Sequence, residues 1–494
     1  MCVAAQIKAA GTSTVTIELK GEPAMTAPSR MLASFILTCA VSACTSGGTE
    51  RADRTEVGAN DRSAYCADTV LGAKADETLV WNQVMLDAIV AGSLGNPPVM
   101  RMAATVNTAL FDAQNGVSRE YTPIFVKQTA PPATHCRAAE VQAAYVVLKS
   151  FYPAQLSRFD DQRALSLAAF AGDDAAAVER GIAWGENVAN QVLAWRARDG
   201  FSNPVAPYTG AGALVGQWES ATGTTLSPGN IPFTAPFVLT SNTQFQAAFA
   251  RPWASLDSAQ YAASFNEVAT LGAKDGSRRT LDQTHLAYFF NGYATNDYVE
   301  AAIQLATAHR TRRGENARIF ALLTVAMHDT SVTVFRAKLD FAMNPASVTW
   351  RPIKAIAQAQ LDGNPNTAPV PGWLPLIATP NHPEYPASHP GSHGAGPRVL
   401  QHFFGDLNAF ELHPAFNSVF PGPAEGGVQP RRYKRISDMA QEGIDARTYG
   451  GMHFRDASEA TRNAAAQIAD YVLANGAQRL PESAAAGPTL MKIR

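Results

Sequence analysis

The sequence has little of several features that mark well-known protein classes. Charged residues make up 17% of the chain, the formal net charge is −2 and no long basic run occurs, so the composition does not indicate nucleic acid as a partner. Five cysteines in 494 residues are too few for a disulfide-built scaffold. Alternation of apolar and polar residues is scarce, which argues against a sheet-based fold.

Several catalytic motifs are also missing. The sequence contains no Gly-x-Ser-x-Gly elbow, no phosphate-cradling P-loop and no His-Glu-x-x-His, so serine hydrolases, nucleotide enzymes and zinc proteases are disfavoured. His389 and His393 are four residues apart and would share a helix face that could bind a divalent metal. No carboxylate completes a zinc ligand set, and we interpret His393 as an ordinary buried or surface histidine.

The N-terminus resembles an export signal. Arg30 precedes a short apolar run, 31–40, and small residues lead to Cys44. The run is well short of the roughly 20 residues that a spanning helix needs, so residues 1–44 predict a bacterial lipoprotein signal with lipidation at Cys44. An ordinary secretory signal cut nearby is the alternative. The polar stretch 45–75 predicts a flexible tether.

This interpretation places the chain in the periplasm or cell envelope, attached to the membrane only through a lipid. An oxidising compartment would allow Cys66 and Cys136 to pair. Two free thiols are equally consistent with the sequence.

The remaining chain has helical periodicity in both halves. Apolar residues recur at helical spacing within 141–148, 182–195, 319–326 and 436–444. Between about 201 and 252 the composition changes to Gly, Pro, Thr and Ser, which predicts a loop-rich crossover. At this length more than one core is expected. We therefore predict an all-α fold of two helical bundles with long loops, an N-terminal helical domain at 76–250 and a catalytic domain at 251–480.

Three clusters in the second half carry candidate chemistry. The first is Trp350-Arg351-Pro352 with Lys338 upstream, the second runs from His382 through Ser388 to His389, and the third begins at Arg447 and ends at His453. Small residues before a helix leave backbone N–H groups open to anions. Two glycines between Arg447 and His453 let the backbone turn. Arginine suits oxyanion oxygens, and histidine has its ordinary pKa near neutrality.

The order Lys, Arg-Pro, Pro-x-x-His and Arg-x5-His resembles the signature of vanadium-dependent haloperoxidases and type 2 phosphatidic acid phosphatases. The resemblance is strongest over 315–457 and fainter over the N-terminal helices, as at 101–115. It implies the two-bundle fold of the haloperoxidases, and a tetrahedral oxyanion, vanadate or in its place phosphate, as the bound group.

The resemblance also implies roles for single residues. Lys338, Arg351 and Arg447 would supply cations to the oxyanion, and the backbone N–H of Ser388 one further donor. His453 would be the axial ligand of vanadate, and His389 an acid–base group opposite it.

The chain departs from the family pattern in several places. Ala387 stands where the family motif has Ser, Ser388 replaces its Gly, and Ala446 replaces a Ser before the second Arg. Arg351 comes thirteen positions after Lys338, a longer spacing than in the family, so Arg336 and Lys354 are substitutes for Lys338. No carboxylate matches the one that braces the second Arg in chloroperoxidases, and Asn291 and Asp297 are the candidates for its place.

Three functions remain open. The first is a vanadate-dependent haloperoxidase that uses hydrogen peroxide to oxidise a halide, or through it a small organic substrate. His382 corresponds to a position where bromoperoxidases tend to carry His, so we expect bromide or iodide to be favoured. The second is a phosphatase acting through a phosphohistidine at His453. The third is a non-catalytic lipoprotein with a decayed site. The halide, the organic substrate and a homodimer are left undecided.

Overall fold

The computed structural model describes Cys66 and residues 76–210, 212, 214–250, 255–424 and 426–481. The predicted signal segment, Cys44 and most of the predicted tether lie outside these residues.

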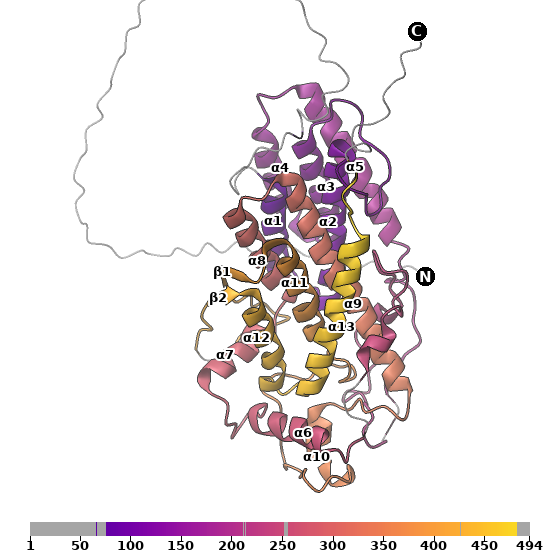
Figure 1. The fold of residues 1–494 in the computed structure, drawn as a ribbon, viewed down its shortest axis with the longest axis vertical. Coiled ribbons are helices and arrows are strands. Elements are labelled where there is room, and N and C mark those ends of the chain that lie inside the picture. The colour runs from indigo at the N-terminus through magenta and orange to yellow at the C-terminus, as the bar shows by residue number, and fades with distance from the viewer. Residues whose placement is uncertain are drawn as a thin grey trace, which may run out of the picture. The chain divides into compact units, whose positions relative to one another are not determined.

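Helices are the main regular secondary structure of the described residues, which confirms the predicted all-α class (Figure 1). The α-helices are α1 (Glu77–Ala91), α2 (Asn96–Ser118), α3 (Cys136–Phe151), α4 (Leu156–Ala168), α5 (Ala175–Arg196), α6 (Ala259–Leu271), α7 (Leu281–Phe289), α8 (Ala294–His309), α9 (Arg313–Met343), α10 (Pro352–Ala357), α11 (His389–Phe404), α12 (Ile436–Tyr449) and α13 (Arg455–Asn475). Short 3-10 turns are η2 (Pro153–Gln155), η3 (Ile231–Phe233), η4 (Gln246–Phe249) and η5 (Ala359–Leu361).

Local sequence fixes several helix starts. Asp76 caps α1 by accepting a hydrogen bond from the backbone N–H of Leu79, and Thr280 and Gln283 form a capping box at α7. Prolines occupy the first turns of α2, α10 and α11, where their missing N–H would have no intrahelical partner in any case. These caps explain why the helical pattern starts where it does.

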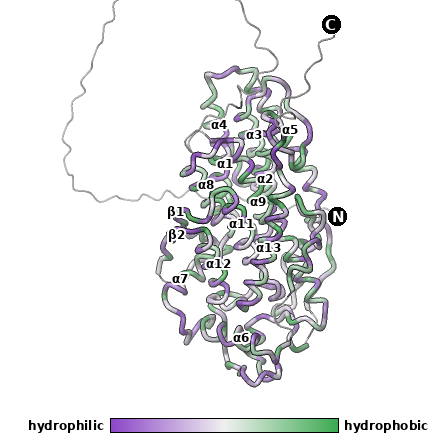
Figure 2. Tube along the Cα trace, in the orientation of Figure 1, coloured by the Kyte–Doolittle hydropathy of each residue, from purple (hydrophilic) through white to green (hydrophobic). Residues whose placement is uncertain are grey.

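Helix α9 runs through the middle of the fold. It packs against α2, α11 and α13, while α2 also packs against α3 and α5. Helix α9 is long and apolar enough to cross a membrane, but 94% of its most apolar 18-residue stretch is buried inside the protein. It is therefore a core helix here. Figure 2 shows hydrophobic and hydrophilic residues mixed along the helices, as expected when each helix buries one face.

The hydrophobic core does not divide at residue 250. One cluster of buried side chains contains members from Leu79 to Ala477, and the segment Val57–Arg494 forms a single unit of contacts. The predicted loop-rich crossover packs onto the second half, where the backbone oxygen of Gly216 accepts hydrogen bonds from the N–H groups of Thr349 and Trp350. The two predicted helical regions therefore share their packing.

Two features go beyond the helices. Strands β1 (Leu407–Leu412) and β2 (Arg431–Arg435) pair antiparallel, with Phe410 opposite Tyr433, so the fold contains a two-stranded ribbon that the sequence pattern did not predict. Cys66 and Cys136 form a disulfide with a Cα–Cα distance of 5.2 Å, which decides between the two alternatives left open by the sequence.

Candidate active site

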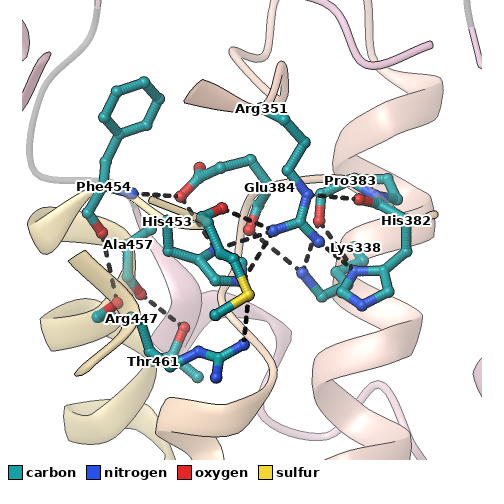
Figure 3. A network of polar contacts seen from close by, with 12 residues as sticks. Lys338, Arg351, His382, Pro383, Glu384, Arg447, His453, Phe454, Ala457 and Thr461 are labelled. Atoms are coloured by element: carbon teal, nitrogen blue, oxygen red, sulfur yellow. Dashed lines mark hydrogen bonds and ion pairs between the residues drawn. The ribbon is translucent and has the colours of Figure 1, made fainter. Parts of the chain in front are cut away.

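Four segments distant in sequence bring the predicted cationic and histidine side chains together (Figure 3). Lys338 comes from the last turns of α9, Arg351 is the residue before α10, and His382 lies in the loop before α11. Arg447 lies in the last turn of α12, and His453 in the connection to α13. All five side chains are buried.

The connection between α12 and α13 requires glycine. Gly451 has φ +73°, and a Cβ atom there would lie 2.5 Å from the backbone oxygen of Gly272 and 2.8 Å from Pro375. Only glycine combines this conformation with so close an approach of backbone. The turn returns the chain so that Met452 N–H donates to Arg447 O at 3.1 Å and His453 faces Arg351.

Arg351 is the centre of the hydrogen-bond network. Its Nε donates to His382 O at 2.8 Å, its Nη2 contacts His382 Nδ1 at 2.8 Å, and its Nη1 donates to Met452 O at 2.8 Å. The same Nη1 lies 2.9 Å from Nε2 of His453. Because guanidinium nitrogens only donate, the contact with Arg351 favours an unprotonated Nε2 atom in His453. The Nδ1 atom of His382 lies between the Arg351 donor at 2.8 Å and the Pro383 carbonyl oxygen at 3.3 Å, and the shorter contact favours the acceptor role.

The longer spacing between Lys338 and Arg351 does not move the lysine away from the loop before α11. Helix α9 continues to Met343, residues 344–346 are exposed, residues 347–348 are partly buried, and the chain is buried again at Trp350. Lys338 Nζ donates to Pro383 O at 2.7 Å and to Glu384 O at 3.2 Å.

The two substitutes for Lys338 have other partners. Arg336 pairs with Asp340 at 2.9 Å, and Lys354 pairs with Glu219 at 3.2 Å, in both cases with partly exposed side chains. The structure thus places Lys338, and neither Arg336 nor Lys354, beside His382 and Glu384.

Arg447 is buried with few partners. Its Nη1 lies 3.4 Å from Phe290 O, its Nη2 lies 3.2 Å from Met452 Sδ, and its Nε has no hydrogen-bond partner. In the part of the chain that the structure describes, no carboxylate forms an ion pair with Arg447, so neither Asn291 nor Asp297 braces it. A buried guanidinium without a counter-charge is costly, and an oxyanion would satisfy its donors.

The charges around the site act together on the histidines. Burial lowers the pKa of Arg351 to about 10, opposed by the Glu384 carboxylate, and burial together with Arg351 lowers the pKa of Arg447 to about 9. Both remain cationic at neutral pH. Burial, followed by Arg351 and Lys338, holds the pKa of His453 and of His382 well below its usual range. The site therefore combines cations with neutral imidazoles.

Glu384 is a site residue that the sequence analysis missed. Its side chain is fully buried, and its Oε1 lies 3.3 Å from His453 Nδ1 and accepts the Phe454 N–H at 3.1 Å. Figure 3 shows the carboxylate directed toward His453. Its position between prolines in the histidine-rich segment was a usable signal, because a charged residue in an otherwise apolar run needs a partner when buried.

His389 and Ser388 lie at the start of α11 and line a cavity of about 330 Å³ together with His382. His389 Nε2 lies 3.2 Å from Gly292 O and 3.1 Å from Asn96 Nδ2. Burial and Arg447 hold its pKa well below the usual range. Asn96 and Met100 from α2 also line this cavity, so the surroundings of the site are not confined to the predicted catalytic domain.

His393 does not join His389 in a metal site. Its Nδ1 contacts the Tyr298 hydroxyl at 2.9 Å and its ring packs edge-on against Phe290. Within the described ranges no group of three His, Cys, Asp or Glu side chains is arranged to hold a metal ion.

Comparisons with known proteins bear on the fold and on the second half of the chain. Residues 318–481 match the family model of the VCPO second helical-bundle domain. The fold superposes on a bacterial vanadium-dependent iodoperoxidase with a TM-score of 0.67 and 19% identity, covering 82% of this chain and 97% of that one.

Two structures of a bacterial vanadium-dependent chloroperoxidase also match. The apo form has a TM-score of 0.58 and 15% identity, covering 77% of this chain and 93% of that one. The holo form has a TM-score of 0.57 and 16% identity, covering 76% and 91%. A search of curated proteins found no match. At these identities the solved structures establish the shared fold.

Proposed function

We propose that this chain binds vanadate and uses hydrogen peroxide to oxidise a halide. The match of residues 318–481 to the VCPO second helical-bundle domain and the fold shared with bacterial vanadium-dependent peroxidases support this proposal. Lys338, Arg351 and Arg447 would hold the oxyanion in this proposal, and His453 Nε2 would be its protein ligand. Vanadate, when bound, supplies a Lewis acid that activates peroxide for attack by the halide.

The observation that carries the proposal is the unsatisfied guanidinium of Arg447. Its Nε has no partner, its Nη2 meets only a thioether sulfur, and the side chain is 1% exposed. Arg351 provides a second buried guanidinium, which contacts His453 in the same site. Buried cations of this kind stabilise a protein only when an anion joins them, and tetrahedral oxyanions accept the several hydrogen bonds on offer.

The neutral state of His453 supports the same proposal. Its Nε2 accepts a hydrogen bond from Arg351 and therefore keeps a lone pair. The Arg351 guanidinium would donate to the oxygens of a bound oxyanion, and the Nε2 lone pair of His453 would be available to its central atom. A protonated His453 could not act as a ligand, and the neighbouring cations oppose its protonation.

His389 is the proposed acid–base group. Its ring lines the cavity from which peroxide would enter, and it is neutral because burial and Arg447 lower its pKa. A neutral imidazole can accept a proton from incoming peroxide and return it to the departing oxygen. Overall, halide, hydrogen peroxide and one proton give hypohalous acid and water.

For the halide we propose bromide or iodide over chloride. His382 lies on the cavity wall, with its ring edge-on to Phe335 at 5.2 Å between centroids, and Arg351 donates to its Nδ1. The His382 imidazole thus puts a polar ring on the cavity wall, and it occupies one N–H group of Arg351 that could otherwise donate to the oxyanion. Ala387 is buried and offers no hydroxyl. A less strongly polarised peroxide oxidises iodide or bromide before chloride.

The deciding experiment loads purified protein with vanadate and assays peroxide with each halide in turn, in parallel with phosphate-ester hydrolysis by protein without vanadate. The proposal expects halide oxidation that depends on vanadate. A His413→Ala variant is the control, because His413 is exposed and pairs with Glu300, and it should keep full activity. Phosphate-ester hydrolysis without halide oxidation would replace the proposal by a phosphatase acting through His453, and chloride oxidised as fast as bromide would overturn the halide assignment.

A further inference from the structure

We propose that Glu384 is a positioning residue that fixes which ring nitrogen of His453 faces the bound oxyanion. The inference rests on the proposed function, because it concerns the histidine assigned there as the axial ligand. It adds a residue from a different segment of the chain, the loop before α11, to the group that prepares His453 for binding.

The two ring nitrogens of His453 differ in their nearest polar partner, and Arg351 Nη1 also lies 3.5 Å from Nδ1. Nε2 lies 2.9 Å from Arg351 Nη1, a group that only donates. Nδ1 lies 3.3 Å from Glu384 Oε1, a group that accepts when ionised. A single tautomer satisfies both contacts, with the proton on Nδ1 and the lone pair on Nε2. Glu384 therefore specifies the nitrogen that remains free to bind the central atom.

The carboxylate is itself held in place. Its Oε1 also accepts the Phe454 N–H at 3.1 Å, so the acid contacts the histidine and the residue after it. At its own backbone, Glu384 N–H donates to Thr349 O at 2.9 Å, and its carbonyl oxygen accepts from Lys338 Nζ at 3.2 Å. The residue thus joins three segments of the site. This rigidity is what an orienting partner of a ligating histidine needs.

If Glu384 acted only through its charge, removing it would raise the affinity for anions, whereas the positioning role predicts a lower affinity for vanadate. A carboxylate beside Arg351 partly cancels the positive field, so removing it should favour any anion that binds only by electrostatic attraction and hydrogen bonds. Positioning predicts a loss for vanadate, because vanadate also forms a bond to the histidine nitrogen. Comparing two oxyanions therefore separates positioning from charge.

The experiment measures dissociation constants of vanadate and of inorganic phosphate for the full chain by isothermal titration calorimetry. For Glu384→Gln we expect vanadate affinity to fall about 10- to 100-fold, the usual effect of removing an outer-shell partner, while phosphate affinity stays equal or rises. Asp112→Asn is the matched control, because Asp112 is also buried and accepts backbone N–H groups, from residues 124–126 in another part of the fold. It should change neither constant.

Equal changes for vanadate and phosphate in Glu384→Gln, or no change for vanadate, would overturn the inference while leaving the proposed function intact. Failure of the wild-type protein to bind vanadate would overturn both. A second measurement needs no variant of Glu384: the 15N shifts of the His453 ring, assigned with His453→Ala, should show Nδ1 protonated and Nε2 unprotonated. The opposite tautomer in the wild-type protein would refute the inference directly.

Discussion

Replacing Arg447 with methionine should stabilise the protein without bound anion and abolish its response to oxyanions. Burial and Arg351 lower the pKa of Arg447 from 12.5 to about 9. At 1.36 kcal/mol per pH unit, keeping the side chain charged costs at most roughly 5 kcal/mol. This cost is fully present below pH 9, where the folded protein holds the charge, and is lost as the pH rises from 9 toward 12.5.

The net gain will be smaller than this limit. The variant loses the weak contacts to Phe290 O and Met452 Sδ, but methionine fills much of the same space and needs no hydrogen bonds. Replacing buried charges by apolar side chains of similar volume commonly stabilises a protein by about 1–4 kcal/mol. We expect Arg447→Met to gain about 1–3 kcal/mol on that scale.

The assay is urea denaturation followed by circular dichroism, with and without vanadate. Vanadate should raise the wild-type midpoint and leave that of Arg447→Met unchanged, since ligands stabilise only the state that binds them. The matched control is Arg196→Met. Arg196 is equally buried, but it pairs with Asp199 at 2.7 Å and donates to Ala235 O.

Removing Arg196 leaves a buried carboxylate with one cation fewer and should destabilise the protein by about 3–5 kcal/mol. The reasoning predicts opposite signs for two buried arginines. A loss of stability for Arg447→Met without anion, comparable to that of Arg196→Met, would show that Arg447 is satisfied within the protein, which would refute the argument.

Three further predictions follow from named contacts. His453→Ala should abolish vanadate binding, whereas His389→Ala should keep the anion and lose about 10²- to 10⁴-fold in turnover; unchanged vanadate affinity for His453→Ala would contradict the ligand assignment. Burial and Arg447 lower the pKa of His393 from 6.5 to about 3. Between these values the unfolded chain binds more protons than the folded protein, so the free energy of unfolding decreases as the pH falls below 6.5. His393→Asn should reduce this decrease by up to roughly 5 kcal/mol, and the same pH dependence of stability in variant and wild type would contradict the prediction. Reducing the Cys66–Cys136 disulfide, which spans 70 positions, should cost about 4 kcal/mol, and an unchanged denaturation midpoint after thiol treatment would argue otherwise.

Export and lipidation at Cys44 remain proposals, because Cys44 and the predicted signal segment lie outside the residues that the structure describes. The disulfide between Cys66 and Cys136 supports an oxidising compartment. Intact-mass analysis of protein recovered from membranes should show a chain that begins at a diacylated Cys44, and a cytoplasmic chain that retains Met31 would contradict this.

The sequence by itself determined the helical class and indicated a family resemblance. Apolar residues at helical spacing in α3, α5, α9 and α12 predict helices because one face of each must be buried, and the structure has them. The ordered clusters around Arg351, His389 and Arg447 predicted the superfamily, because binding a tetrahedral oxyanion demands cations and histidines in a fixed arrangement.

Only the tertiary structure decided how the site is completed. Spacing along the chain gave three candidates for the lysine, and the structure places Lys338 Nζ against the backbone oxygens of Pro383 and Glu384. The segment around Glu384 indicated that a buried carboxylate needs a partner, but it could not identify that partner, since His453 is 69 positions away. The contact between Glu384 in its loop and His453 in a distant turn depends on how α9, α11 and α12 pack. That packing is stabilised by contacts throughout the core, so no single segment of the sequence predicts it.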